Sequence, residues 1–370
     1  MKSRRSLAKL HRALVASGLT SATAFAGTFN WTGVASGDWN DPANWTLVPT
    51  MVSTDTYPLQ GATYAGDQLR IANWAPVDGA PVVYNGAVYN PGAGVVTNFN
   101  IGRGIVIGVG NGPAATPPNV KGSASLTISS GAIVVNRVGA GSGNEPYMAN
   151  RSDATLHLNG GDLNVSNVNG LEFRLIQEGF PGLTSTITID EGTLTANLLI
   201  RMFDTAGEPV EERFGAGVIN LNGGVLAVNR FNLTAPAPAG QSSFTINLNG
   251  GTLRARNANV NYLNALPDTS VLVKAGGAVI DTNTFAITVA APLRTDPALG
   301  SALDGGLNKI NTGTLTLTAS DSTYTGGTRV NQGTLVINHD GNLGAPSGGL
   351  SFTGTANVNV AANITSARPV

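Results

Sequence analysis

The chain has 370 residues, of which 48 are Gly and 12% are charged, and it contains no Cys. This composition is typical of short strands and tight turns, and it excludes disulfides, thiolate metal sites and a Cys nucleophile. The 21 basic residues fall to 16 against 22 acidic ones once residues 1–26 are removed, which leaves about −6. Such a balance disfavours nucleic acid and anionic membranes as partners, because both attract clustered Lys and Arg.

Residues 1–26 have the features of a secretory signal peptide. Five basic residues without an acid precede the apolar run ALVASGLTSATAFA, which closes on Ala24-Phe25-Ala26. A basic start, a short apolar core and small residues at the exit predict cleavage after Ala26. The run is too short and too rich in Ser, Thr and Gly for a membrane span.

Residues 27–100 form an N-terminal Trp-rich region that we expect to cap the fold. All four Trp residues are found here: Trp31, Trp39, Trp45 and Trp74. Bulky side chains would close the open end of a repetitive core, and we favour this interpretation. The alternative is an aromatic platform for sugar rings, in which these four residues contact carbohydrate.

The same region holds oxygen-bearing side chains at Asp38, Asn40, Asp41 and Asn44. They are potential Ca²⁺ ligands, but their spacing and charge fall short of a known calcium loop. Asx turns before Pro42 explain them better, so no metal site is predicted.

Residues 101–300 repeat one pattern of two short strands around a Gly corner. LHLNGGDLNV, INLNGGVLAV and INLNGGTLRA share nearly the same letters, and looser copies surround Gly131, Gly192 and Gly276. Successive corners are 25 to 32 residues apart. Periods of this length indicate stacked coils.

The positions at −5, −3, +2 and +4 from each corner Gly are apolar in all six copies. Alternate positions of a strand share one face, so each copy has one dry and one wet face. The 24 residues are Leu126, Ile128, Ile133, Val135, Leu156, Leu158, Leu163, Val165, Ile187, Ile189, Leu194, Ala196, Ile219, Leu221, Leu226, Val228, Ile246, Leu248, Leu253, Ala255, Val271, Val273, Ala278 and Ile280.

The fold expected from this pattern is all-β: a right-handed parallel β-helix, or β-solenoid. Parallel stacking aligns like residues in ladders, Asn on Asn and Leu on Leu, and the Gly corner permits a positive-φ turn. An antiparallel β-sandwich built from hairpins with Asn-Gly turns is the alternative.

Residues 301–370 contain a dense motif. The stretch from Gly306 to Leu335 reads GLNKINTGTLTLTASDSTYTGGTRVNQGTL. Its motif positions are Lys309, Gly313, Leu315, Leu317, Tyr324, Thr325, Gly326, Gly327, Thr328, Gly333, Thr334 and Leu335. This stretch resembles the autotransporter-associated β-strand repeat, also called the passenger-associated transport repeat. The opening WTGVASGDWNDPANW is similar to the start of large secreted bacterial proteins that carry such repeats.

The resemblance implies a β-helical passenger region on the outer surface of a Gram-negative-type cell. In that family the repeat is thought to assist passage through the outer membrane and folding beyond it, and the motif contains no catalytic residue. The chain ends ANITSARPV without a barrel-length segment. We therefore expect either a fragment truncated within its last repeat, with a translocator or anchor missing beyond Val370, or a secreted relative.

Catalytic alternatives are weaker. His157 is at an outward strand position, where we expect solvent exposure, and His339 is in a turn; no His pair has zinc-ligand spacing. Acidic candidates for glycoside cleavage are Asp190, Glu191, Glu208, Glu211 and Glu212. Arg137, Arg174, Arg201 and Arg230 are candidates for binding an acidic polysaccharide. Solvated loop charges explain both sets more simply.

The sequence thus predicts an exported, non-enzymatic β-solenoid that acts as a surface stalk, spacer or adhesive passenger without cofactors. A cell-surface glycan or another matrix component is the expected kind of partner. A polysaccharide lyase or hydrolase on the same fold, and a carbohydrate-binding module built on the Trp residues, are the alternatives.

Overall fold

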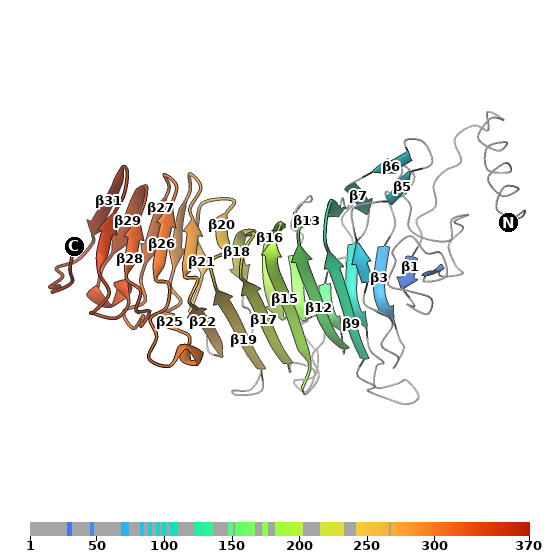
Figure 1. Cartoon of the computed structure of the whole chain (residues 1–370), viewed down its shortest axis with the longest axis horizontal. Helices are drawn as coiled ribbons and strands as arrows, with labels where there is room; N and C mark the ends of the chain where they lie inside the picture. The colour runs from blue at the N-terminus through green and yellow to red at the C-terminus, as the bar shows by residue number, and fades with distance from the viewer. Residues whose placement is uncertain are drawn as a thin grey trace, which may run out of the picture.

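The computed structural model describes residues 28–31, 45–47, 68–73, 82–84, 88–90, 94–96, 98–101, 104–109, 122–135, 147–150, 152–166, 172–176, 182–202, 215–232, 242–265 and 268–370. The strands in these ranges stack side by side into an elongated rod, with β1 near one end and β31 at the other (Figure 1). The long axis of the rod runs across the strands, as expected when each coil lies on the one before it.

Sheet A has sixteen strands and extends along the rod. Its main path is β2 (Trp45–Leu47), β1 (Thr28–Trp31), β3 (Gln68–Asn73), β8 (Gly104–Val109), β11 (Tyr147–Asn150), β14 (Glu172–Ile176), β16 (Thr193–Met202), β18 (Val225–Asn232), β20 (Thr252–Ala255), β23 (Ala278–Asp281), β26 (Leu307–Ile310), β28 (Thr328–Val330) and β30 (Leu350–Phe352). Beside this path lie β7 (Asn98–Ile101), β10 (Ala132–Val135) and β13 (Asp162–Val165).

Two further sheets complete the coil. Sheet B contains β4 (Val82–Tyr84), β9 (Gly122–Ile128), β12 (Ser152–Asn159), β15 (Thr184–Glu191), β17 (Gly215–Leu221), β19 (Ser242–Leu248), β22 (Thr269–Val273) and β25 (Leu293–Thr295). Sheet D contains β21 (Asn259–Leu263), β24 (Ala286–Val289), β27 (Thr314–Leu317), β29 (Gly333–Ile337) and β31 (Ala356–Val360). The hairpin β5 (Val88–Asn90) with β6 (Gly94–Val96) stands apart, and the 3₁₀ turns η4 (Pro297–Leu299) and η5 (Asp340–Leu343) lie between strands.

Strand pairing is parallel throughout the three sheets, except between β1 and β2. The predicted all-β parallel solenoid is therefore confirmed, and the antiparallel sandwich is wrong. The reason is that each Gly corner turns the chain into a different sheet instead of back along its own strand. The handedness of the coil stays a prediction of the general rule for parallel connections.

The apolar faces predicted for the six copies stack into one continuous column, which is the core of the rod. Leu158 is in register with Ile189, Ile189 with Leu221, and Leu221 with Leu248. All 24 residues of the apolar pattern have exposed fractions of 1% or less and belong to one core cluster. Burial of a side chain of this size contributes about 1.5–3 kcal/mol before the entropy of folding is counted.

The corners need Gly for two different reasons. Gly192 and Gly224 have φ values of 80° and 54°, in the left-handed region that the sequence predicted for them. At Gly251 the reason is contact instead, because a Cβ atom there would lie 2.3 Å from the carbonyl oxygen of Gly223 in the neighbouring coil. In that corner Gly250 takes the positive φ, at 98°.

Polar ladders run along the outer surface, as predicted. Asn247 donates to the side-chain oxygen of Asn220 at 2.8 Å, and Asn220 donates to the Thr188 hydroxyl at 3.2 Å. These bonds join residues 27 and 32 positions apart in sequence, so they hold the stacking register from outside the core.

The cross-section changes near β20. The long strand β16 pairs with both β13 and β14, so sheet A covers two sides of the coil there. From β20 onward the second side forms the separate sheet D, which begins at β21. At this junction the Phe231 and Tyr262 rings meet edge to face, with centroids 6.1 Å apart.

Candidate functional site

The motif of residues 306–335 builds two successive coils. Leu315 in β27 is in register with Leu335 in β29, and both are fully buried. Leu317 is also buried, at 3% exposure. The two corners touch directly, because the N–H of Thr334 donates to the carbonyl oxygen of Gly313 at 3.2 Å.

Both corner glycines of the motif are required by this stacking. A Cβ atom at Gly313 would lie 2.1 Å from the carbonyl oxygen of Phe285. Gly333 has a φ of 71° and has the backbone of Thr312 and Gly313 against it. The Gly-Thr-Leu segments of the motif are therefore corners followed by inward-facing Leu residues.

The Tyr-Thr-Gly-Gly-Thr segment is held by a buried carboxylate, Asp304. Its two oxygens accept hydrogen bonds from the N–H groups of Gly306, Thr325 and Gly326 at 2.8–2.9 Å. The Thr295 hydroxyl donates to it at 2.6 Å. Burial alone would raise the pKa of Asp304, but these hydrogen bonds hold the pKa below its usual value of 3.8.

Asp304 was not among the residues that the sequence singled out. It precedes the motif, and only the stacking of one coil on the next brings it to Thr325 and Gly326. An acidic residue directly before a Gly-Gly corner was the one available signal. Asp304 thus joins two successive coils through residues that are 21 positions apart in sequence.

Tyr324 lies wholly inside the fold. Its hydroxyl is 2.6 Å from that of Thr328 and donates to the carbonyl oxygen of Asn342 at 3.3 Å. Burial raises the pKa of Tyr324 above its ordinary value of 10.0. The first and last residues of Tyr-Thr-Gly-Gly-Thr are thus joined through their hydroxyls, which makes this segment a packed unit.

Lys309 is the unusual member of the motif, because it occupies a core position. It is in register with Ile280 and Val330 and has no exposed surface. Its ammonium donates to the Thr282 hydroxyl at 2.9 Å and to the carbonyl oxygens of Ile310 and Asn311 at 3.2 and 2.6 Å. Burial lowers the pKa of Lys309 from 10.5 to about 8.

A chain of polar contacts connects Lys309 to the two preceding coils. Asn311 donates to Asp281 at 2.7 Å, and Arg254 donates to the other oxygen of Asp281 at 2.7 Å. Asp281 itself is 1% exposed. Burial would raise the pKa of Asp281, but the hydrogen bonds from Asn311 and Arg254 lower it below 3.8.

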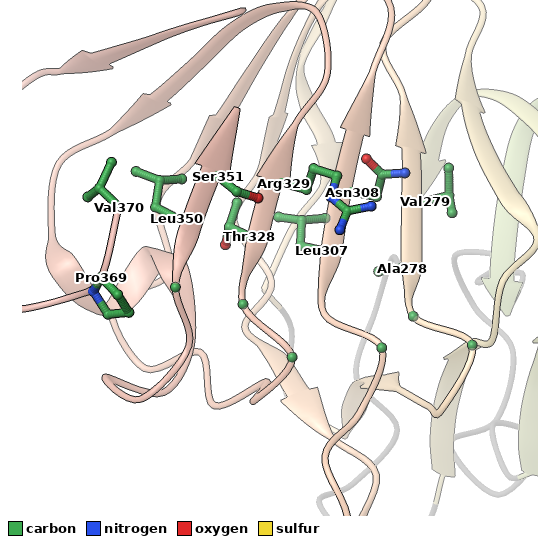
Figure 2. A pocket seen from close by; sticks show the side chains of 16 residues that line it. Ala278, Val279, Leu307, Asn308, Thr328, Arg329, Leu350, Ser351, Pro369 and Val370 are labelled. Carbon is green, nitrogen blue, oxygen red and sulfur yellow. The ribbon is translucent and has the colours of Figure 1, made fainter. Parts of the chain in front are cut away.

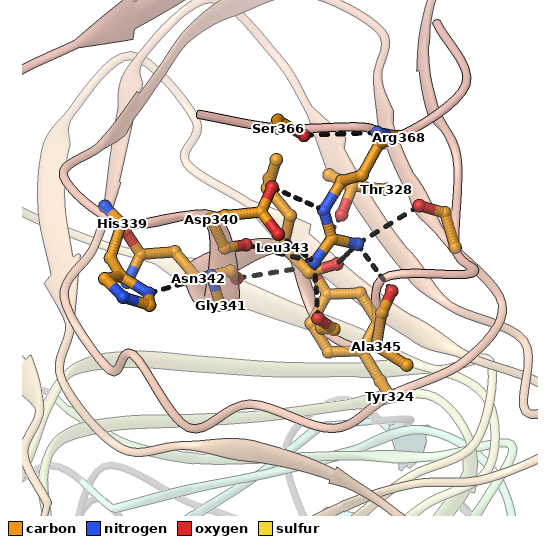
Figure 3. A network of polar contacts seen from close by, with 12 residues as sticks. Tyr324, Thr328, His339, Asp340, Gly341, Asn342, Leu343, Ala345, Ser366 and Arg368 are labelled. Atoms are coloured by element: carbon orange, nitrogen blue, oxygen red, sulfur yellow. Dashed lines mark hydrogen bonds and ion pairs between the residues drawn. The ribbon is translucent and has the colours of Figure 1, made fainter. Parts of the chain in front are cut away.

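The loop after the motif encloses Arg368 (Figure 3). The Arg368 guanidinium pairs with the Asp340 carboxylate at 2.8 and 3.1 Å. It also donates to five backbone carbonyl oxygens, those of Asp340, Leu343, Gly344, Ala345 and Gly348. Asn342 closes the same loop by donating to Ala319 of the preceding coil at 2.8 Å. Arg368 was also missed from the sequence, because its acceptors are 20 to 28 residues away.

A shallow groove of about 510 Å³ follows the Gly-Gly corners on the outside of the motif coils (Figure 2). Asn308, Arg329 and Ser351 lie along it at successive register positions. Asn308 has a buried side-chain oxygen without a hydrogen-bond partner. Arg329 is exposed, and none of the residues that the structure describes pairs with its guanidinium. The groove therefore presents one cation, Arg329, that is not paired with any described residue.

The predicted acidic site is brought together only in part. The Asp190 carboxylate lies 2.7 Å from Nε2 of His157 and accepts from Asn222 at 2.9 Å. The hydrogen bonds from Asn222 and His157 lower the pKa of Asp190 below 3.8. His157 is therefore paired with Asp190. Its side chain is 31% exposed, so it is less open to solvent than the sequence predicted but is not part of the core. Glu191 is exposed at the same corner.

The remaining charged candidates are dispersed. Arg174 is buried in β14, Arg230 is exposed in β18, and Arg201 lies in β16. Glu208, Glu211, Glu212 and Arg137 lie outside the described residues. His339 is the N-cap residue directly before η5, where its Nδ1 accepts from the N–H of Gly341 at 2.9 Å, in agreement with the predicted turn.

Of the Trp residues, Trp31 and Trp45 are register partners across the antiparallel pair β1–β2. Trp39, Trp74 and the candidate calcium ligands Asp38, Asn40, Asp41 and Asn44 lie outside the described residues. Within the described ranges, no group of three or more His, Asp or Glu side chains is placed to hold a metal ion. The same ranges contain no helix with the length and hydropathy that a membrane crossing requires.

Comparisons with known proteins agree with the geometry. The family model for the passenger-associated-transport-repeat matches residues 307–337, which are the two motif coils described above. An adhesin, the BmaC autotransporter of Brucella suis biovar 1 (strain 1330), is 46% identical over 74 residues, or 20% of this chain. The aligned part is 2% of that relative's length. No solved structure matches the chain. The chain is thus a parallel β-solenoid that carries a passenger-associated transport repeat at residues 307–337.

Proposed function

We propose that the chain is an exported, non-enzymatic section of an autotransporter-type passenger that serves as a stalk with an adhesive surface on a Gram-negative-type cell. The observation that carries this proposal is the unbroken column of buried side chains that ends in a passenger-associated transport repeat. The adhesin relative supports the adhesive part. Residues 1–26 would direct export, with cleavage after Ala26.

The physical basis is that the apolar column is built from contacts between neighbouring coils. Leu221, for example, is in register with Ile189 on one side and Leu248 on the other. A chain crossing a membrane unfolded can therefore add one coil at a time to those already folded. The hydrogen bonds from the backbone of Thr325 and Gly326 to the Asp304 carboxylate would fix the register between the motif coils without disulfides or cofactors.

Breaking one coil tests this mode of folding. The variant Leu221→Asp places an unpaired charge in the middle of the column, and Asn220→Asp changes the adjacent outward residue of the same strand as a matched control. We expect limited proteolysis of Leu221→Asp to cut near β15 to β19 while the coils from β26 to β31 stay protected. Asn220→Asp should keep the wild-type pattern. Loss of protection over the whole rod at once would contradict folding by successive coils.

Adhesion and enzymatic activity are separated by two assays on the mature chain. Binding to immobilised matrix proteins and glycans should be saturable and should weaken in Arg329→Ala, because that guanidinium is the free cation of the outer groove. Incubation with acidic and neutral polysaccharides should release no shortened chains. Cleavage that is lost in Asp190→Asn would instead favour a polysaccharide-degrading enzyme.

A further inference from the structure

Three corners of the solenoid carry the same four letters, Leu-Asn-Gly-Gly, and therefore the same local chemistry. They begin at Leu158, Leu221 and Leu248. In an Asn-Gly pair the amide nitrogen of Gly can attack the Asn side-chain carbonyl, because Gly has no Cβ to hinder the approach. In an unfolded chain the three pairs should react at similar rates, so differences between them in the protein arise from the fold.

Two of these Asn residues are held on both sides. Asn222 donates to Asp190 at 2.9 Å and accepts from Asn249 at 3.2 Å. Asn249 in turn accepts from the N–H of Gly276 at 3.0 Å. The attacking N–H groups are engaged as well: that of Gly223 donates to Ile189 at 3.0 Å, and that of Gly250 to Gly277 at 2.8 Å.

Asn159 has none of these restraints. Both Asn159 and Gly160 are exposed, and neither the carboxamide of Asn159 nor the N–H of Gly160 has a hydrogen-bond partner in the part of the chain that the structure describes. Gly160 has a φ of 117°, a conformation that leaves the peptide unit outside a regular strand.

The next coil explains why the ladder does not include Asn159. There the corner reads Asp190-Glu191 in place of Asn-Gly, and the strand register shifts between Leu158 and Asn159. This shift sets Asn159 opposite Glu191. The Asp190 carboxylate is turned to His157 and Asn222. Asn159 is thus left with a solvated carboxylate as neighbour.

We propose that Asn159 is a site of spontaneous deamidation and that Asn222 and Asn249 are protected from it. The Gly160 nitrogen forms a bond to Cγ of Asn159, and the bond from Cγ to Nδ2 breaks. Ammonia leaves with the proton that the Gly160 nitrogen gives up. Water then opens the cyclic imide at one of its two carbonyls, which yields Asp or isoaspartate and restores the N–H of Gly160.

The product changes the outer surface of the rod. A carboxylate at position 159 would lie in register with Glu191, so two like charges would face each other across adjacent coils. Isoaspartate would also lengthen the backbone at a crowded corner, where even a Cβ atom at Gly160 would lie 2.5 Å from the carbonyl oxygen of Ser129 in the preceding coil. The reaction would therefore add negative charge to this corner and loosen it.

The test is to incubate the folded mature protein at warm, mildly alkaline pH and to follow the three sites by peptide mass spectrometry. We expect conversion at Asn159 to be at least about tenfold faster than at Asn222 or Asn249, because even one or two net hydrogen bonds that must break slow a step by about that factor. In urea the three rates should become similar.

A matched pair of variants tests the cause of protection. Asp190→Ala removes the acceptor of the Asn222 carboxamide, whereas Asp190→Asn keeps an acceptor oxygen there. Conversion of Asn222 should increase in Asp190→Ala and stay slow in Asp190→Asn. In the folded wild-type protein, conversion of Asn159 that is no faster than conversion of Asn222 or Asn249 would overturn the proposal. This comparison does not depend on whether a variant folds.

Discussion

Replacing the buried Lys309 by Met should stabilise the protein at neutral pH. Met fills a similar volume in a column whose neighbours are Ile280 and Val330. The pKa of Lys309 is lowered from 10.5 to about 8, so the charged amine makes the folded state about 3 kcal/mol less stable than the neutral amine would. Of the three acceptors of Lys309, the Thr282 hydroxyl and the Ile310 carbonyl stay hydrogen-bonded to each other. The Asn311 carbonyl would lose its Lys309 donor, which costs about 1 kcal/mol. The net gain at pH 7 should be about 2 kcal/mol.

The pH dependence identifies the cause. The folded pKa of Lys309 is depressed, so the unfolded chain binds the proton more tightly. The destabilisation is therefore fully present below about pH 8, and it is relieved as the pH rises toward the unfolded value of 10.5. Wild-type stability should rise across this window, and the advantage of Lys309→Met should shrink.

Urea unfolding followed by circular dichroism between about pH 6 and pH 10 measures both effects. Lys274→Met is the control, because this residue is 28% exposed and paired with Asp296, so its loss should not stabilise. A Lys309→Met variant that is less stable than wild type at every pH would refute the reasoning, and so would a wild-type stability that stays flat above pH 8.

Four other changes probe the stacking contacts. Asp304→Ala should destabilise the motif coils by about 3 kcal/mol, since it leaves the N–H groups of Gly306, Thr325 and Gly326 unpaired; thermal unfolding measures it. The wild-type contribution of Asp304 should be present above about pH 4 and fade as the pH falls through its lowered pKa, which Asp304→Ala should not show. Gly223→Ala should cost about 2–3 kcal/mol, because its Cβ would lie 2.0 Å from the Asp190 carbonyl oxygen, whereas Gly349→Ala meets ordinary contacts at 3.4 Å and should be nearly neutral. Leu221→Ala should cost about 3 kcal/mol in urea unfolding, and equal stability would exclude it from the core. Arg368→Ala should speed hydrogen exchange in residues 339–350 while leaving β17 and β19 unchanged, and uniform faster exchange would contradict a local role.

The strands and their inward faces could be predicted from the sequence because the information is local. Leu156, Leu158, Leu163 and Val165 alternate around one Gly corner, and that alternation fixes which face is buried whatever lies above or below. The passenger-associated transport repeat was recognisable for a related reason, since Gly313 and Gly333 are demanded by the close contact of adjacent corners.

The candidate site was harder to predict from residue types. Asp190 and His157 were both singled out, yet their pairing depends on one coil bringing together residues 33 positions apart in sequence. The Glu residues at 208, 211 and 212 have no periodic pattern that would place them on a face. Sequence spacing alone therefore could not decide whether the acidic residues form one group.

By itself, the sequence determined the repeating unit and the apolar face of each strand, because both follow from alternation and period along the chain. It favoured parallel stacking over an antiparallel sandwich, and the strand pairing in the structure decided between them. Only the tertiary structure decided what the polar residues do: that Lys309 is buried, that Asp304 and Arg368 hold backbone loops, and that Asn159 is left out of the ladder. The physical reason is that a hydrogen bond between coils depends on ångström-scale register between residues 20 or more positions apart, whereas burial of an apolar face depends only on which side of its own strand a residue occupies.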